Sequence, residues 1–223
     1  MKIDILTLFP KMYSGPFDES IVRRAQDKGL VEINIHDLRE FGEGQRRTVD
    51  DRPYGGGIGM ILRVDIIDSA LKDLRNKESK VILLDAGGEK FSQKKAVKLS
   101  KVDHLILIAG HYEGVDARIH EHLVDEIISI GDYILTGGEI PTMVVADAIT
   151  RLIAGVIEKP QATELESFSR ENILEYPQYT RPEEYRGWKV PKVLLSGNHK
   201  EIDIWRKEES LKKTKKVRPD LIV

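Results

Sequence analysis

Apolar residues follow two patterns in the first 155 positions of the chain. Five runs rich in Ile, Leu and Val are nearly continuous, which is typical of strands in a parallel sheet buried on both faces. Between these runs, apolar residues recur every three or four positions, as they do along one face of a helix. The expected strands span 2–9, 31–37, 80–86, 104–110 and 126–132, and the expected helices span 18–29, 64–77, 92–101 and 141–154. This order predicts an α/β fold with a mostly parallel sheet and helices on both faces.

Residues 39–63 fit neither pattern and read REFGEGQRRTVDDRPYGGGIGMILR. An aperiodic segment of this length is uncommon in a compact domain, and such segments are frequently functional. Its arginines and aspartates stand beside a run of glycines. We therefore expect a functional loop here.

The pattern loosens after Gly155, and we predict three parts. They are an α/β domain over 1–155, a flexible linker over 156–180 and a small, basic, helical domain over 181–223. The last part carries 12 Lys and Arg against 7 Asp and Glu, whereas the preceding residues carry 23 against 30. This asymmetry indicates a surface that faces a polyanion, although a solvated helix face would have the same composition.

The composition excludes several kinds of site. The chain has no cysteine, so disulfides, thiolate nucleophiles and cysteine-bound zinc are ruled out. It has no apolar run of 18 residues, and its first residues are too polar for a signal segment. We expect a cytoplasmic protein without a membrane partner.

Glycines gather after three of the late strands, in DAGGE (85–89), AGHYEG (109–114) and IGDYILTGGE (130–139). Ligands of open α/β sheets bind beyond the carboxyl ends of strands, so three such loops predict one cleft. Backbone without side chains offers amide donors and acceptors at close range, which suits recognition of an adenine edge and a ribose. Each glycine alone would also be explained by a tight turn. A nucleotide-dependent dehydrogenase fits less well, because GGGIG (55–59) follows a charged loop rather than a strand.

Five strings occur in order along nearly the whole chain: TVDDRPYGGGIGM (48–60), AGHYEGVDAR (109–118), SIGDYILTGGE (129–139), YPQYTRP (176–182) and VLLSGNHKEIDIWR (193–206). Together they resemble the bacterial tRNA (guanine-N1)-methyltransferases, the TrmD family of the knotted SPOUT superfamily. The resemblance implies a deep trefoil knot in the C-terminal part of the sheet and an obligate homodimer. It also implies S-adenosylmethionine as cofactor, use of Mg²⁺, and tRNA rather than DNA as the partner.

The implied reaction is methyl transfer to N1 of the guanosine immediately 3′ of the anticodon. That nitrogen carries a proton, so a base must remove it, and a cation must stabilise charge on O6. The resemblance assigns the base to Glu166 in the string ESF, where the family has aspartate, and the cation to Arg151. Glu164 lies two positions earlier, so a local shift in the alignment with the family would make Glu164 the base instead of Glu166. Without the resemblance, we would interpret these side chains as linker solubility and a solvated helix end.

The resemblance also carries over the binding residues. It places Glu113 near the methionine part of the cofactor and as a Mg²⁺ ligand, and Ala86 stands where the family has proline. The full cofactor set is Ala86, Gly110, Tyr112, Glu113, Gly114, Ile130, Gly131, Asp132, Tyr133, Ile134, Leu135, Gly137 and Gly138. The tRNA set is Arg46, Asp50, Gly57, Gly59, Arg181, His199 and Arg206.

Two further functions stay open at the level of sequence. Another knotted enzyme could methylate a ribose 2′-hydroxyl of RNA instead of a base. A non-catalytic RNA-binding protein would explain the basic C-terminal part but would transfer no methyl group.

Overall fold

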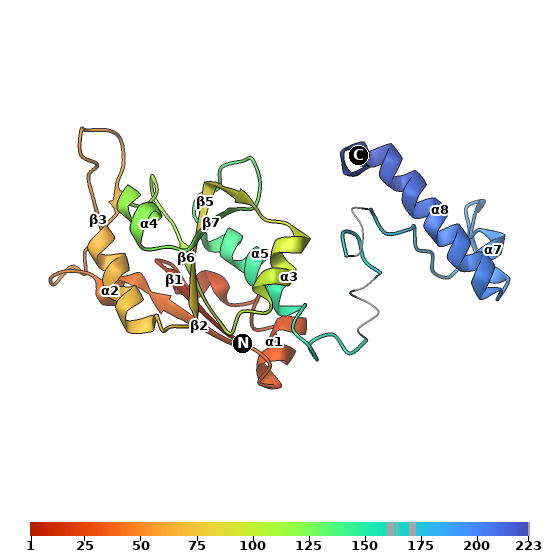
Figure 1. Cartoon of the computed structure of the whole chain (residues 1–223), viewed down its shortest axis with the longest axis horizontal. Coiled ribbons are helices and arrows are strands. Elements are labelled where there is room, and N and C mark those ends of the chain that lie inside the picture. The colour runs from red at the N-terminus through yellow and green to blue at the C-terminus, as the bar shows by residue number, and fades with distance from the viewer. Residues whose placement is uncertain (160–162, 164, 170–172, 223) are drawn as a thin grey trace. The chain divides into compact units, whose positions relative to one another are not determined.

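The computed structural model describes residues 1–159, 163, 165–169 and 173–222 (Figure 1). Its internal contacts divide the chain into two compact units, Met1–Glu158 and Lys159–Val223. In the described part of the chain, the helices are all too short or too polar to cross a membrane.

The first unit is built on a five-stranded sheet with the order β2-β1-β6-β5-β7. Every neighbouring pair in this sheet is parallel, so the predicted α/β class with a mostly parallel sheet is confirmed. The strands are β1 (Lys2–Thr7), β2 (Glu32–Asp37), β5 (Ser79–Lys90), β6 (His104–Ala109) and β7 (Glu126–Ser129).

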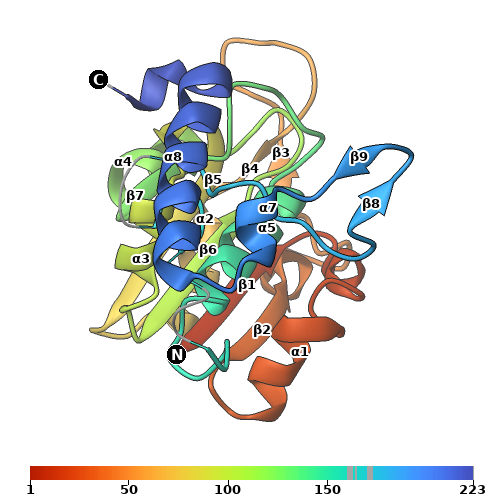
Figure 2. The same ribbon diagram turned by 90° about the vertical axis from the view of Figure 1, so that its right-hand side faces the viewer.

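Helices pack against both faces of this sheet, as Figures 1 and 2 show. One face carries α1 (Ser20–Asp27), α3 (Gln93–Leu99) and α5 (Glu139–Thr150), and the other carries α2 (Val64–Leu74) and α4 (Ala117–His122). Two 3₁₀ helices, η1 (Pro10–Tyr13) and η2 (Leu38–Phe41), follow β1 and β2.

Strand β5 explains why the apolar runs are continuous. Ile82 and Leu84 pack into the core on the α5 side, while Val81 and Leu83 pack into the core on the α2 side. Successive side chains of a strand point to opposite faces, so a sheet covered on both sides needs an apolar residue at every position.

Several predicted boundaries are wrong by a few residues. The apolar runs at 2–9 and 126–132 extend beyond the strands, which end at Thr7 and Ser129. Leu8 and Ile130 still pack in the two cores, so the pattern there marks burial rather than strand pairing. Helix α5 begins two residues before Pro141, and α4 was not predicted as an element because it has only six residues.

Residues 39–63 are not wholly a loop. They contain η2 and a small antiparallel pair, β3 (Asp50–Asp51) and β4 (Ile61–Leu62). Two-residue strands are too short to produce a readable period. Val49 and Leu62 are buried and anchor this hairpin, whereas the residues between the two strands are mostly exposed.

The described residues of the second unit form a hairpin followed by helices. The hairpin pairs β8 (Glu184–Tyr185) with β9 (Trp188–Lys189) and was not expected from the sequence. It is followed by α7 (Lys192–Leu195), α8 (His199–Val217) and a 3₁₀ turn, η3 (Pro219–Leu221). Near the end of α8, the Thr214 hydroxyl accepts a hydrogen bond of 2.9 Å from the backbone N–H of Leu174.

Candidate functional site

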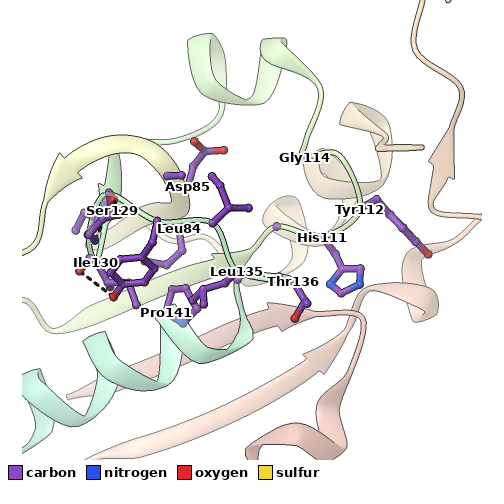
Figure 3. Close-up of a pocket in the computed structure, with 18 of the residues that line it drawn as sticks. Leu84, Asp85, His111, Tyr112, Gly114, Ser129, Ile130, Leu135, Thr136 and Pro141 are labelled. Carbon is purple, nitrogen blue, oxygen red and sulfur yellow. Dashed lines mark hydrogen bonds between the residues drawn. The ribbon is translucent and has the colours of Figure 1, made fainter. Parts of the chain in front are cut away.

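A hollow of about 150 Å³ lies at the carboxyl ends of β5, β6 and β7 (Figure 3). It is formed by the three glycine-containing loops, one within β5 and the others after β6 and β7, so the predicted convergence of the loops is observed. Its lining residues are Leu84, Asp85, Ala86, Gly110, His111, Tyr112, Glu113, Gly114, Ile128, Ser129, Ile130, Gly131, Tyr133, Ile134, Leu135, Thr136, Gly137, Gly138 and Pro141.

Nearly all predicted cofactor residues belong to this lining. Asp132 is the exception. Its carboxylate forms an ion pair of 2.5 Å with Lys90 on β5. The lining residues that the sequence did not suggest are Leu84, Asp85, His111, Ile128, Ser129, Thr136 and Pro141. Their positions depend on how the loops meet, which residue type and spacing do not reveal.

The first loop of the hollow is an excursion within β5. Leu84 and Glu89 both pair with Ile128 of β7, so residues 85–88 leave the sheet and return to it. The Asp85 carboxylate accepts a hydrogen bond of 2.7 Å from Gly87 N, which closes a tight turn. A Cβ on Gly88 would lie 2.6 Å from the backbone N of Ile128, so only glycine fits at this crossing.

The second and third loops touch through their backbones. Gly138 N donates a 2.6 Å hydrogen bond to Gly110 O, and a Cβ on Gly138 would lie 2.6 Å from Gly110 N. Neither backbone can yield without moving its loop, so a side chain at position 138 would separate the two walls of the hollow.

Two tyrosines give the hollow its present shape. Tyr112 holds a left-handed backbone conformation (φ 60°) and is 41% exposed. Such a conformation is uncommon for a bulky residue, and strain of this kind often accompanies a ligand site. The Tyr133 ring lies against Gly131, and its hydroxyl donates a long 3.3 Å hydrogen bond to Ile130 O, dashed in Figure 3.

A buried polar network supports the floor of the hollow. Glu139, the first residue of α5, is only 1% exposed. It accepts a 2.9 Å hydrogen bond from the Thr7 hydroxyl, and its other oxygen lies 3.5 Å from His111 Nδ1. Gly137 sits between these two groups, because a Cβ there would lie 2.4 Å from both. No local sequence pattern predicts this network, since Thr7, His111 and Glu139 are far apart in the chain.

The network continues from Glu139 into the core of the unit. Thr142 Oγ1 donates a 2.7 Å hydrogen bond to the Glu139 carbonyl oxygen. The Tyr13 hydroxyl lies 2.7 Å from Thr142 Oγ1 and therefore acts as the donor to it. Burial raises the pKa of Tyr13 well above its usual value. Its hydroxyl therefore stays protonated and fixes α5 against η1.

The glycine-rich segment of the β3–β4 hairpin is anchored to the second loop. Glu113 N donates to Met60 O at 3.1 Å, and Leu62 N donates to Gly114 O at 3.0 Å. A Cβ on Gly59 would lie 2.5 Å from Glu113 Cγ. The structure therefore brings the predicted tRNA residue Gly59 against the predicted cofactor residue Glu113. Gly57 (φ 142°), Arg46 and Asp50 belong to the same hairpin region.

The predicted catalytic residues do not line the hollow. Arg151 directly follows α5 in the first unit, and its N–H donates to Asp147 O at 3.1 Å. Glu166 belongs to the second unit, where its carbonyl oxygen accepts hydrogen bonds from Ser169 N (3.2 Å) and Ser169 Oγ (2.6 Å). Glu164, the alternative base, lies outside the described residues.

Three predicted tRNA residues also lie in the second unit. Arg206, on α8, packs its guanidinium 4.9 Å from the centre of the Tyr176 ring and lies 3.5 Å from the Asp203 carboxylate. His199 is the first residue of α8, and Arg181 is exposed just before the hairpin. Among the described residues, no group of three or more His, Cys, Asp or Glu side chains is arranged to hold a metal ion.

Comparison with known proteins gave consistent matches over the whole length. Residues 1–223 match the family model described as tRNA (Guanine-1)-methyltransferase TrmD. A tRNA (guanine-N(1)-)-methyltransferase of Dictyoglomus turgidum is 55% identical over 222 residues, covering 100% of this chain and 90% of the relative. Relatives with the same name are 53% identical in Carboxydothermus hydrogenoformans (100% and 87% covered) and 52% identical in Mycoplasmopsis synoviae (100% and 97% covered).

Proposed function

This chain belongs to the tRNA (guanine-1)-methyltransferase family, and we propose that its hollow binds S-adenosylmethionine for methyl transfer to the guanosine immediately 3′ of the tRNA anticodon. The enzyme is a tRNA (guanine-N1)-methyltransferase. The full-length family match carries this conclusion, because it includes both units of the chain.

The lining of the hollow suits the cofactor. Backbone amides of three loops offer donors and acceptors for the adenine and ribose, and Leu84, Ile130 and Leu135 offer apolar contacts for the ring. Ligand pockets usually enclose roughly 300 Å³ or more, and this hollow is smaller. We therefore expect Tyr133, whose ring is held by one long hydrogen bond, to turn aside when the cofactor enters.

Glu166 is the proposed base. S-adenosylmethionine supplies the electrophilic methyl group, and the enzyme must remove the N1 proton so that the nitrogen lone pair can attack. A glutamate carboxylate can accept this proton, although its extra methylene moves the oxygens relative to the aspartate of the family. The turn closed by Ser169 fixes the backbone of Glu166 and supports a defined position for the carboxylate.

Arg151 is the proposed stabiliser of O6. Loss of the N1 proton moves negative charge onto O6, and a planar guanidinium that is always charged suits this position. Helix α5 separates Arg151 from Gly138 by 13 positions, so Arg151 lies about 20 Å along the helix axis from Gly138 at the hollow. An arginine side chain does not reach that far, so a second copy of the chain would have to supply it.

This distance and the surface of the first unit support a homodimer. Phe9, Met12, Ile140 and Val144 are each between 38% and 48% exposed. Ile140 and Val144 are one turn apart on α5. Phe9 precedes η1 and Met12 lies within it, and the Tyr13–Thr142 hydrogen bond ties η1 to α5. An apolar surface of this kind is typical of a subunit interface.

A deep trefoil knot in the C-terminal part of the sheet is also part of the proposal. Strand β5 lies between β6 and β7 in the sheet although it precedes both in sequence, an order that is compatible with a threaded chain but is shared by unknotted doubly wound sheets. The close backbone contact between Gly138 and Gly110 supports a segment threaded through a loop.

The proposed tRNA contacts lie in both units. Gly59 adjoins the hollow through Glu113, and Arg46, Asp50 and Gly57 lie in the same region of the chain. Arg181, His199 and Arg206 belong to the predicted basic domain over 181–223. The predicted flexible linker over 156–180 would let that domain follow the RNA. Cations that contact phosphates make binding salt-dependent. Glu113 is the proposed Mg²⁺ ligand, with water, cofactor or RNA completing the coordination shell. We expect the enzyme to act in the cytoplasm.

The proposal is tested by incubating the protein with radiolabelled S-adenosylmethionine and two tRNA transcripts that differ only in carrying G or A after the anticodon. We expect label only in the G transcript, recovered as N1-methylguanosine after digestion. Label on a ribose 2′-hydroxyl would identify the other kind of knotted enzyme. Binding of tRNA without transfer would identify a non-catalytic RNA-binding protein.

A further inference from the structure

The β8–β9 hairpin leaves two large aromatic side chains in solvent. Tyr185 and Trp188 face each other across the two strands, with ring centroids 5.9 Å apart. Their exposed fractions are 53% and 71%. Figure 2 shows the hairpin extending away from α7 and α8 of its own unit, so these helices do not cover it. Aromatic rings usually contribute by burial, and rings left in water at adjacent positions suggest a binding surface.

The turn of the hairpin adds a cation to the same surface. Arg186 lies with its guanidinium 5.2 Å from the centre of the Tyr185 ring. Arg186 (φ 53°) and Gly187 (φ 82°) both have positive φ, as a two-residue hairpin turn of type I′ requires. Asparagine or glycine normally occupies the first of these positions. An arginine in this conformation is unusual, and such outliers are a reason to look for function.

The charge of the hairpin favours a polyanion. Glu184 and Lys189 pair across the opposite face of the hairpin, with the carboxylate and the ammonium 3.4 Å apart. From 181 to 192 the chain carries four cations (Arg181, Arg186, Lys189, Lys192) against two carboxylates (Glu183, Glu184), a net charge of +2. Among the described residues no carboxylate pairs with Arg186, and Glu184, which pairs with Lys189, lies on the opposite face of the hairpin from the two rings.

We propose that Tyr185, Trp188 and Arg186 form a stacking surface for an unpaired base of the tRNA, distinct from the guanosine that is methylated. Base stacking on aromatic side chains is the usual means by which proteins hold single-stranded RNA without reading its sequence. Arg186 contacts the adjoining phosphate or stacks over the face of the base. The proposal rests on the proposed function for its choice of RNA, and its test is independent of methyl transfer.

The direct test uses Trp188 as the reporter. The chain has two tryptophans, so Trp205→Phe leaves Trp188 as the only one. A tRNA anticodon stem-loop is titrated into this variant while tryptophan emission is recorded, and a fully paired RNA duplex of equal length is the control. We expect the stem-loop to quench the emission and the duplex to leave it nearly unchanged. Equal quenching by both RNAs, or by neither, would overturn the proposal.

Variants test the same surface by kinetics. Trp188→Ala and Tyr185→Ala should each raise KM for tRNA about tenfold while leaving kcat and S-adenosylmethionine affinity unchanged, because a stacked base contributes roughly a factor of 5 to 150 in affinity. Trp188→Phe should restore most of the loss. Glu184→Gln is the matched control, because it breaks the ion pair on the opposite face and leaves the rings in place.

Two outcomes separate the possible failures. If Trp188→Ala leaves KM for tRNA unchanged but converts the protein to monomers in sedimentation experiments, the face is a subunit interface and the proposal is wrong. If the wild type transfers no methyl group to tRNA, the proposed function fails, and the fluorescence titration still decides whether the hairpin stacks on RNA.

Discussion

In the amino-terminal half of β1 the parallel sheet buries a carboxylate among donors, whereas at the carboxyl ends of its strands the polar groups remain partly unpaired. Asp4 of β1 is fully buried and accepts hydrogen bonds from His36 Nε2 (2.9 Å), His104 Nε2 (2.6 Å) and Asn34 Nδ2 (3.0 Å). Lys2 Nζ forms an ion pair with it at 2.9 Å. Each donor comes from β1 or from a strand adjacent to it.

The carboxyl ends are arranged differently. His111 Nδ1 is buried without a hydrogen-bond partner among the described residues, and its nearest carboxylate oxygen is 3.5 Å away. Tyr112 holds an unusual backbone conformation, and Ile134 is 83% exposed. Buried polar groups are normally paired and apolar ones normally covered, so a departure from both rules at one edge of the sheet marks a site for a ligand. The buried Asp4 cluster therefore stabilises the fold, whereas the carboxyl ends of the strands are left open for binding.

The largest expected effect is on turnover. Glu166→Gln keeps the shape of the side chain but removes its capacity to accept a proton, so kcat should fall by roughly 100- to 10,000-fold. Single-turnover assays with saturating tRNA measure this loss, and calorimetry should find cofactor affinity unchanged. Glu164→Gln is the matched control and should retain activity. If the two variants exchange these results, Glu164 is the base.

The next effect is on stability and tests the buried cluster around Asp4. Asp4→Asn should lower the free energy of unfolding by about 3–5 kcal/mol, because it breaks a buried ion pair and leaves its donors unmatched. Urea denaturation measures the change. Methyl transfer below the unfolding transition should stay at the wild-type rate. A variant that kept its stability but lost activity would contradict the division between the two ends.

The pH dependence of the same residue has a definite sign. Burial alone would raise the pKa of Asp4, but hydrogen bonds from His36, Lys2, Asn34 and His104 lower it well below its usual value. Its contribution to stability is therefore present above the unfolded-state pKa of about 4 and is lost as pH falls below that value. Asp4→Asn should flatten the acid limb of a plot of unfolding free energy against pH.

A smaller effect tests the support of the hollow. Thr7→Val keeps the shape of the side chain but removes the hydroxyl that donates to Glu139 and accepts from Phe9 N (3.0 Å). Leaving these groups unpaired should cost about 1–3 kcal/mol in unfolding free energy. Cofactor affinity should fall only a few-fold, since Glu139 lies behind Gly137 rather than in the hollow. Thr7→Ser should restore both values.

The sequence predicted the sheet and the three loops because both leave local patterns. Buried strands need unbroken apolar runs, and tight backbone crossings such as Gly138 over Gly110 need glycine. It could not predict the partners of Asp4 and Glu139, because these contacts join residues as much as 132 positions apart. It also missed the β8–β9 hairpin, whose two-residue strands are shorter than any readable period.

The central claim is that the hollow at the carboxyl ends of β5, β6 and β7 holds S-adenosylmethionine. Its most direct test is a calorimetric titration of the cofactor into the wild type, Asp4→Asn and Gly138→Ala, at a temperature where all three are folded. The account predicts equal binding by the first two and no measurable binding by Gly138→Ala, whose added Cβ would lie 2.6 Å from Gly110 N. Undiminished binding by Gly138→Ala, or none by the wild type, would contradict it.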